Sequence, residues 1–265
     1  MNKSKIPTVI RKLAIEAGEK IMEIYEAGDL MVKAKLDKSP VTIADEIADA
    51  LISDGLRAAF PESVLVTEEQ VDTHFATSDT FFIVDPLDGT KEFIHRRGDF
   101  TVNIAYVEDG VPTMGVVYAP EQKRLFITDA VGVSFEELGD HNVDIVGEMK
   151  RISVSIPDDD ALIVVASKSH LTDETRDYIG KYNVKDSRSA GSSLKFCLVA
   201  TGEADIYPRF GRTMEWDTAA GQAILEGAGG CVVKFDNYER LTYGKPAFEN
   251  PHFIAYAPGI QLQKA

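Results

Sequence analysis

The sequence has little of several features that mark specialised classes of protein. Its 265 residues include only two cysteines, Cys197 and Cys231, which form neither a disulfide framework nor the spacing of a zinc site. Both lie in apolar segments and are expected to be buried free thiols. No apolar run is long enough to span a bilayer, and there is no internal repeat, low-complexity segment or flexible linker. These absences favour a globular chain with a substantial core of its own.

Basic residues are also in short supply. There are 28 lysines and arginines against 43 aspartates and glutamates, so the formal net charge is −15. Because polymeric nucleic acid binds basic surfaces, this charge argues against such a partner. The N-terminal stretch is rich in charge and lacks a signal-peptide core. We therefore expect a cytoplasmic location and leave open a peripheral association with the inner face of the cell membrane.

The most informative segment is Phe81–Phe93, which reads FFIVDPLDGTKEF. Its short apolar run predicts a buried strand that ends at Asp85, and Pro86 marks the turn that follows. Asp85 and Asp88 would thus lie at the carboxyl end of a strand, where open α/β sheets bind ligands. Hard cations such as Mg²⁺ prefer oxygen ligands of this kind.

The same turn offers more than carboxylates. The main-chain carbonyl of Leu87 is a further oxygen ligand, and Gly89 and Thr90 begin a predicted helix whose N–H groups would suit a phosphate oxygen. The plain structural alternative is that Asp88 only caps that helix.

Three further acidic residues stand at boundaries of predicted elements. Glu68 follows an apolar run, Asp45 opens a helix, and Asp217 precedes an alanine-rich stretch. Each has an ordinary explanation: Glu68 as a surface acid, Asp45 as the partner of Thr42 in a capping box, and Asp217 as an N-cap. Taken together, the acidic positions favour a metal site.

Three motifs, Thr67–Glu69, Asp85–Thr90 and Trp216–Gly221, resemble those of the inositol monophosphatase superfamily of Mg²⁺-dependent, lithium-sensitive phosphatases. The likeness runs from the first predicted helix to about Phe253. Composition and pattern alone predict a mixed α/β (α+β) fold. The resemblance implies a layered α-β-α-β-α sandwich of the inositol monophosphatase/fructose bisphosphatase type.

Within this superfamily, three segments are similar to the branch of CysQ-type 3'(2'),5'-bisphosphate nucleotidases: Lys91–Phe93, Gly191–Ala200 and Tyr207–Gly211. The resemblance implies hydrolysis of the 3'-phosphate of adenosine 3',5'-bisphosphate to leave AMP. It extends to adenosine 5'-phosphosulfate 3'-phosphate as a further substrate and implies a link to sulfate assimilation. The partner would be this small phosphonucleotide, and the protein a monomer or a homodimer.

The resemblance also assigns roles to individual residues. Two or three Mg²⁺ ions per site would be held by five positions: Glu68, Asp85, the Leu87 carbonyl, Asp88 and Asp217. Asp45 and Thr90 would form the dyad that orients and deprotonates the attacking water. Substrate contacts would come from Gly89, Thr90, His170, Ser192, Lys195 and Arg209. For His170 a plain position at the start of a helix is an equal alternative.

Three other functions stay open on the sequence alone. The nearest is a sibling phosphatase acting on inositol monophosphate or fructose bisphosphate. A phosphatase of the haloacid dehalogenase type is disfavoured, because its two aspartates are two positions apart whereas Asp85 and Asp88 are three apart. The third is a non-catalytic protein that binds or senses a phosphonucleotide without turnover.

Hydrophobic periodicity predicts long helices over about Pro7–Ala27 and Ala44–Phe60, the second with Ile47, Leu51 and Leu56 facing the core. Alternating segments between 101 and 128 predict an antiparallel meander, and from about 162 strands alternate with helices. We expect one phosphatase unit over residues 1–265. Its N-terminal half, about 1–155, would carry most metal ligands, and its C-terminal half, about 156–265, the substrate cradle.

Overall fold

The computed structural model describes residues 2–27, 33–34, 40–75, 78–167 and 171–264. Its α-helices are α1 (Ile6–Ala27), α2 (Ile43–Ala59), α3 (Thr90–Ile94), α4 (Asp173–Ile179), α5 (Leu194–Ala200) and α6 (Ala219–Gly227). Three short 3-10 helices are η1 (Lys3–Lys5), η2 (Val71–Phe75) and η3 (Pro246–Phe248).

The strands form two large sheets and a two-stranded ribbon, β1 (Lys33–Ala34) with β2 (Pro40–Val41). The seven-stranded sheet has the order β3 (Val64–Thr67), β4 (Thr80–Asp88), β5 (Thr101–Glu108), β6 (Val111–Ala119), β7 (Arg124–Thr128), β8 (Ser134–Leu138) and β9 (Glu148–Arg151). The five-stranded sheet has the order β11 (Val184–Ala190), β10 (Leu162–Ser167), β12 (Ile206–Arg209), β14 (Phe253–Tyr256) and β13 (Cys231–Lys234). The predicted meander is confirmed as β5 to β7, which pair antiparallel.

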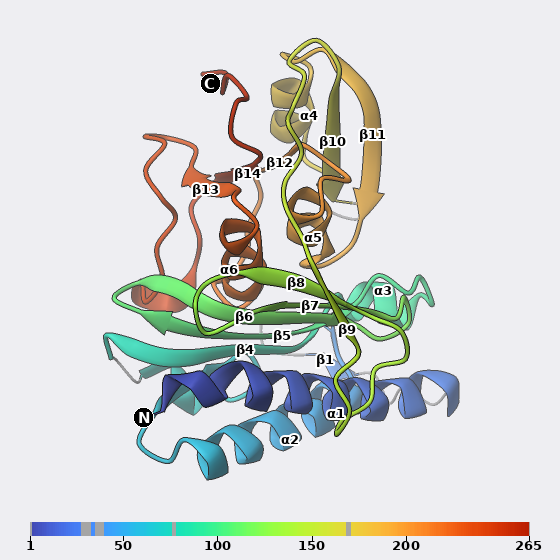
Figure 1. Ribbon diagram of the computed structural model, residues 1–265, viewed down its shortest axis with the longest axis vertical. Coiled ribbons are helices and arrows are strands. Elements are labelled where there is room, and N and C mark those ends of the chain that lie inside the picture. Colours follow the sequence, from blue (N-terminus) through green and yellow to red (C-terminus); the bar gives the residue numbers. More distant parts are fainter. Residues whose placement is uncertain (1, 28–32, 35–39, 76–77, 168–170, 265) are drawn as a thin grey trace.

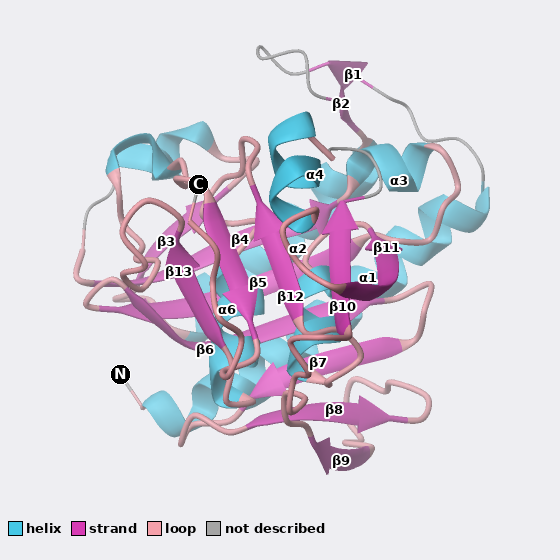
Figure 2. Cartoon of the chain, turned by 90° about the horizontal axis from the view of Figure 1, so that it is seen from above, coloured by secondary structure: helices cyan, strands magenta, loops and turns pink. Residues whose placement is uncertain are grey.

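The elements stack in alternating layers (Figure 1). Helices α1 and α2 cover one face of the seven-stranded sheet, α5 and α6 lie between the two sheets, and α4 covers the outer face of the five-stranded sheet. Seen from above, the strands of the two sheets cross (Figure 2). The mixed α/β fold and its layered α-β-α-β-α arrangement are thus confirmed.

Strand β4 is buried on both faces because it lies between two hydrophobic cores. Phe81 and Ile83 point into the core that contains α5 and α6, and Phe82 and Val84 point into the core under α1 and α2. Successive side chains of a strand alternate between faces, so a continuous apolar run is what such a position requires. The strand therefore delivers Asp85 to the end of a rigid, buried element.

The long helices occur where the periodicity predicts them, but one predicted core residue is wrong. Ile47 is 39% exposed, whereas α2 buries residues at steps of four: Ala44, Ala48, Ile52 and Leu56. A spacing of four keeps side chains on one helix face, so these residues form the buried face of α2.

The two cysteines differ in burial. Cys197 is a buried free thiol as expected, but Cys231, on β13, is only partly buried. Within the described residues, no helix is both long and apolar enough to cross a membrane.

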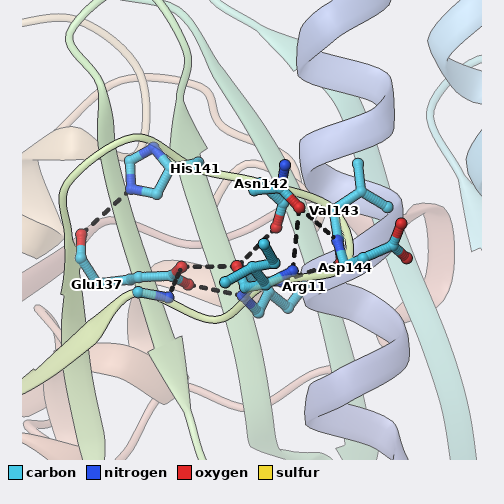
Figure 3. A network of polar contacts seen from close by, with 8 residues as sticks. Arg11, Glu137, His141, Asn142, Val143 and Asp144 are labelled. Carbon is cyan, nitrogen blue, oxygen red and sulfur yellow. Dashed lines mark hydrogen bonds and ion pairs between the residues drawn. The ribbon is translucent and has the colours of Figure 1, made fainter.

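A buried ion pair fastens the loop between β8 and β9 to α1 (Figure 3). The Arg11 guanidinium donates from Nε and Nη2 to the two Glu137 oxygens, each at 2.6 Å. It also donates to loop carbonyls, including that of Asn142 at 2.9 Å. The Gly147 N–H donates to the same carboxylate at 2.7 Å, so both charges are satisfied inside the protein.

Candidate active site

Three carboxylates from distant parts of the chain converge. Single ligand atoms of Glu68, Asp85 and Asp217 all lie within 4.8 Å of one another. Glu68 follows β3, Asp85 lies on β4, and Asp217 comes two residues before α6. Because β3 and β4 are parallel neighbours, both end at the same edge of the sheet, which places the first two acids together.

A β-bulge explains how one strand presents two acids. Asp85 pairs with Asn103 and Asp88 with Thr101, so β4 has one more residue than β5 between these pairs. Such a bulge bends its strand and re-aims side chains. Asp88 lies beside the three-carboxylate cluster, where its Oδ2 accepts hydrogen bonds from Ser193 Oγ at 3.1 Å and from Asn103 Nδ2 at 3.4 Å.

The surroundings of Asp88 and Asp217 disfavour the ionised form of both carboxylates. Burial raises the pKa of Asp88 to about 6, and the Glu68 charge adds to this although Lys195 and Ser193 oppose it. Burial, with the charges of Asp88 and Glu68, raises the pKa of Asp217 well above its ordinary value. Carboxylates that repel one another in a buried site are ready to take up positive charge.

The predicted pair of Asp45 and Thr90 is in contact. Thr90 Oγ1 donates to Asp45 Oδ1 at 3.1 Å, although the two residues are 45 positions apart. Asp45 Oδ2 accepts from the Thr42 N–H at 2.8 Å and from Thr42 Oγ1 at 2.6 Å. The capping box, which was the ordinary alternative for Asp45, therefore exists together with the Thr90 contact and fixes the carboxylate. The Leu87 carbonyl lies 3.4 Å from Thr90 Oγ1.

Glu68, Asp88 and Asp217 line a cavity of about 640 Å³ that is also lined by cations. Its lining includes Asp88, Asp217, Lys195, Arg209 and Arg212. A cavity lined by both metal-type acids and cations is suited to a ligand with more than one phosphate.

Lys195 and Arg209 are buried rather than exposed lysine and arginine side chains. Lys195 is 5% exposed, donates to the Ser192 carbonyl, and lies over the Tyr207 ring at 5.4 Å from its centroid. Burial lowers the pKa of Lys195 to about 8, against the opposing effect of Asp88. Arg209 is 9% exposed and donates from Nη2 to the Arg212 carbonyl at 3.0 Å. Both cations are thus fixed in place before any ligand binds.

Adjacent serines at the start of α5 have different partners. The Ser192 hydroxyl lies 2.8 Å from both the Asp88 and Asp99 carbonyls, so it joins the β4 turn to the segment after α3. Ser193 Oγ instead reaches the Asp88 carboxylate and the Asp217 carbonyl. Ser193 was not among the predicted residues, although it lies in the same segment. Which serine faces the acids depends on the positive φ of 51° at Ser192, which the sequence does not reveal.

Gly89 permits the close approach of these segments. Its φ is +93°, and a Cβ at this position would lie 2.3 Å from Ser192 Oγ. A larger residue would therefore strain the turn and push Ser192 away.

Most of the residues predicted for the site come together. Those that line the cavity are Glu68, Asp88, Gly89, Thr90, Ser192, Lys195, Arg209 and Asp217. Asp85, Leu87 and Asp45 adjoin them through the contacts given above. His170 lies outside the described residues. Glu92, 5% exposed, also lines the cavity and was missed as a site residue, since it lies in a short helix of mixed character.

The chain matches the model of the inositol monophosphatase family over residues 2–258. The chain belongs to the inositol monophosphatase family. Among curated relatives in this family, "3'(2'),5'-bisphosphate nucleotidase CysQ" of Salmonella typhimurium is 42% identical over 248 residues, which is 91% of this chain and 96% of the relative. The protein of the same name from Escherichia coli K12 is 42% identical over 257 residues, 95% of this chain and 96% of the relative.

Solved structures of the inositol monophosphatase family have a similar fold. CysQ from Bacteroides thetaiotaomicron superposes with a TM-score of 0.83 at 41% identity and covers 96% of this chain and 97% of its own. The inositol monophosphatase of Thermotoga maritima gives a TM-score of 0.75 at 27% identity, with 93% and 89% coverage. The similarity thus includes both sheets and the helices between them.

Proposed function

We propose that this chain is a Mg²⁺-dependent 3'(2'),5'-bisphosphate nucleotidase. It would hydrolyse the 3'-phosphate of adenosine 3',5'-bisphosphate to AMP, act also on adenosine 5'-phosphosulfate 3'-phosphate, and serve sulfate assimilation. The observation that carries the proposal is one cavity that is lined both by acids of the cluster, Glu68 and Asp217, and by the buried cations Lys195 and Arg209. The names of relatives at 42% identity support the same activity.

The residues present fit a divalent cation. The acids offer only oxygen ligands, which Mg²⁺ prefers. The raised pKa values of Asp88 and Asp217 reflect burial first and the charges of neighbouring acids second, and a bound cation would offset both. Within the described part of the chain, buried Thr101 Oγ1 and Asn103 Oδ1 have no hydrogen-bond partner, and both residues pair with the acid-bearing bulge of β4. Such orphaned oxygens are expected where ions and ordered water belong.

We assign two or three Mg²⁺ ions to five ligand positions. The first ion would be held by Glu68, Asp85 and the Leu87 carbonyl, and another by Asp85, Asp88 and Asp217. When bound, the ions would make water more acidic and neutralise charge on the phosphate.

The chain's own residues would then orient water and move a proton. Thr90 Oγ1 accepts a proton from the attacking water as it passes its own proton to Asp45 Oδ1, which already lies 3.1 Å away. The water oxygen bonds to phosphorus, and the bond from phosphorus to the ribose 3'-oxygen breaks with its electron pair going to that oxygen. The 3'-oxygen then takes a proton from solvent water, and Asp45 returns the proton it received to solvent. Thr42 holds the Asp45 carboxylate in position through this transfer.

The cations that line the cavity would select the second phosphate. Ser192, Lys195 and Arg209 would bind the 5'-phosphate, and Gly89 and Thr90 would contact the substrate around the reacting group. His170 stays a proposed contact. An inositol monophosphate lacks a second phosphate and would make no charge-assisted contact of this kind with the two cations, which disfavours it.

The proposal also covers the chain as a whole. We propose one catalytic unit, with most metal ligands on the half from about 1 to 155 and the substrate cradle on the half from about 156 to 265. A cytoplasmic location, and a monomer or homodimer, complete it.

The experiment is phosphate release by the purified chain with Mg²⁺ from adenosine 3',5'-bisphosphate and from inositol 1-phosphate, with and without lithium. A lithium-sensitive preference for the nucleotide is expected. A preference for inositol phosphate would retain the metal chemistry and overturn the substrate. Tight nucleotide binding without phosphate release would indicate a non-catalytic sensor.

A further inference from the structure

His74 lies between the two segments that carry Glu68 and Asp217. The first arm is the segment after β3 that contains Glu68, and the second arm is the turn before α6 that contains Asp217. It belongs to η2, and its Nε2–H donates to the carbonyl of Thr67 at 2.8 Å, the residue before Glu68. Its ring stacks on Trp216, the residue before Asp217, with centroids 4.9 Å apart and planes at 24°. One half-buried side chain therefore contacts the immediate neighbours of two acids, one that follows β3 and one in the turn before α6.

The first arm is anchored from beneath. The Glu68 N–H donates to the Val84 carbonyl at 3.1 Å, and Thr67 donates from its hydroxyl to buried Asp49 on α2. The Thr67 N–H also donates to Thr73 Oγ1 at 3.1 Å, which closes the segment from β3 to η2. The His74 ring is thus presented from a segment that has little freedom to shift.

The second arm is a tight turn. The Met214 N–H donates to Asp217 Oδ2 at 2.8 Å, and the Asp217 N–H donates to the Met214 carbonyl at 3.2 Å. These two hydrogen bonds lie within the turn and do not connect it to the segment after β3. The stack of Trp216 on His74 does connect the two segments.

A competing function for the stack is a platform for a ligand's base. Trp216 is only 7% exposed, and Phe248 packs against it at 6.1 Å in addition to His74. Its faces are therefore largely covered by protein. The stack is better suited to bracing the site than to receiving an aromatic ring.

We propose that His74 is a positioning residue that sets the separation of Glu68 and Asp217. The inference rests on the proposed function, since it concerns the same metal site. Until cations bind, the clustered carboxylates repel one another and favour separation of the two arms. His74 opposes that separation through one hydrogen bond and one ring contact, and so preorganises the ligands for Mg²⁺.

The chain supplies its own reporter, because Trp216 is its one tryptophan. The metal-free full chain is titrated with Mg²⁺, and the dissociation constant is measured by calorimetry and by Trp216 emission. Two substitutions separate the two contacts. His74→Phe keeps a ring for stacking and removes the donor, whereas His74→Gln keeps an amide donor and removes the ring.

The matched control is His141, which also contacts one main-chain carbonyl and one aromatic ring, although edge to face, away from the cavity. Its Nε2 lies 3.2 Å from the Glu137 carbonyl, and its ring packs on Tyr118 at 5.1 Å. His141→Phe is expected to leave the Mg²⁺ dissociation constant unchanged.

For His74→Phe we expect a dissociation constant raised by about 10-fold or more, as for loss of a group that orients metal ligands. We expect a lower kcat, an unchanged KM for the nucleotide at saturating Mg²⁺, and partial rescue by His74→Gln. An unchanged Mg²⁺ dissociation constant in both variants, with wild-type chain binding normally, would overturn the role of His74 alone. A wild-type chain that binds no Mg²⁺ would overturn the proposed function, and this inference with it.

Discussion

Two groups of buried charge in this molecule are built in opposite ways. The Arg11–Glu137 pair is closed: each oxygen of the carboxylate meets a guanidinium nitrogen, and Gly147 adds a third donor. The acidic cluster around Asp88 and Asp217 is open: burial and neighbouring charges raise the pKa values of both. The first group stabilises the fold, whereas the second holds unfavourable charge that a cation can neutralise.

The difference shows what distinguishes a functional cluster from a structural one. Buried charge is tolerated where opposite charge and hydrogen bonds satisfy it, as for Glu137. Where like charges are buried together, they lower the stability of the folded protein, and such sites are typical of ligand binding and catalysis. The two groups should therefore respond in opposite directions when a charge is removed.

The largest effect is expected from Asp88→Asn. Loss of this carboxylate should lower kcat by about 10²- to 10³-fold or more, as for other groups that stabilise transition-state charge. The metal-free variant should be more stable by on the order of 1 kcal/mol at pH 7, because a raised carboxyl pKa means that the ionised form opposes folding. Phosphate release and urea unfolding in a chelator measure the two effects. Near-normal turnover with unchanged unfolding would remove Asp88 from the site.

Arg11→Met should act in the opposite direction on stability. Removing the guanidinium leaves Glu137 buried without its partner, which costs about 3–5 kcal/mol. Turnover per folded molecule should stay normal, because neither residue lines the cavity. Urea unfolding of Arg11→Met, Glu137→Gln and the double variant tests this. Additive losses in the double variant would show that the two side chains do not depend on each other.

The sequence predicts the acidic cluster but not the Arg11–Glu137 pair. Asp85 and Asp88 could be found because an apolar run, a proline and a glycine are local signals for the end of a buried strand. Helices α1 and α2 follow from periodicity in the same way. Nothing local indicates that Arg11 meets Glu137, because the two are 126 positions apart and only the layering of α1 against β8 brings them together.

Other parts of the fold escaped prediction for the same reason. The edge strands β9 and β11 consist mostly of exposed residues, so hydrophobic patterning did not reveal them, and pairing with a neighbouring strand is what defines them. His74 is likewise a single histidine in a polar stretch, and its contacts with Thr67 and Trp216 exist only in the folded chain. Local signals thus predict the acids, while tertiary contacts decide what supports them.

A smaller effect on catalysis is expected from Lys195, one of the cations that line the cavity. Lys195→Met keeps the length of the side chain and removes its charge, so KM for adenosine 3',5'-bisphosphate should rise by about 10- to 100-fold, the loss of one charge-assisted bond. KM for adenosine 3'-monophosphate should change little, because this substrate lacks the 5'-phosphate. Steady-state kinetics with both substrates make the test, and Lys91→Met, at an exposed cavity residue, is the control. Equal increases for both substrates would contradict a role in binding the 5'-phosphate.

The smallest expected effect is the pH dependence that the closed pair gives to stability. Burial would raise the pKa of Glu137, but Arg11 and the Gly147 N–H outweigh it and hold the pKa below its ordinary value of 4.5. Between the folded-state pKa of Glu137 and about 4.5, the unfolded chain binds more protons than the folded chain. The contribution of Glu137 to the free energy of unfolding is therefore complete above about pH 4.5 and is lost as the pH falls further. Urea unfolding at pH 6.5 and at pH 4 should therefore show a smaller difference between wild type and Glu137→Gln at the lower pH. A difference that is the same at both pH values would mean that the carboxylate has no special stabilisation in the fold, and the contrast with the acidic cluster would then rest on the cluster alone.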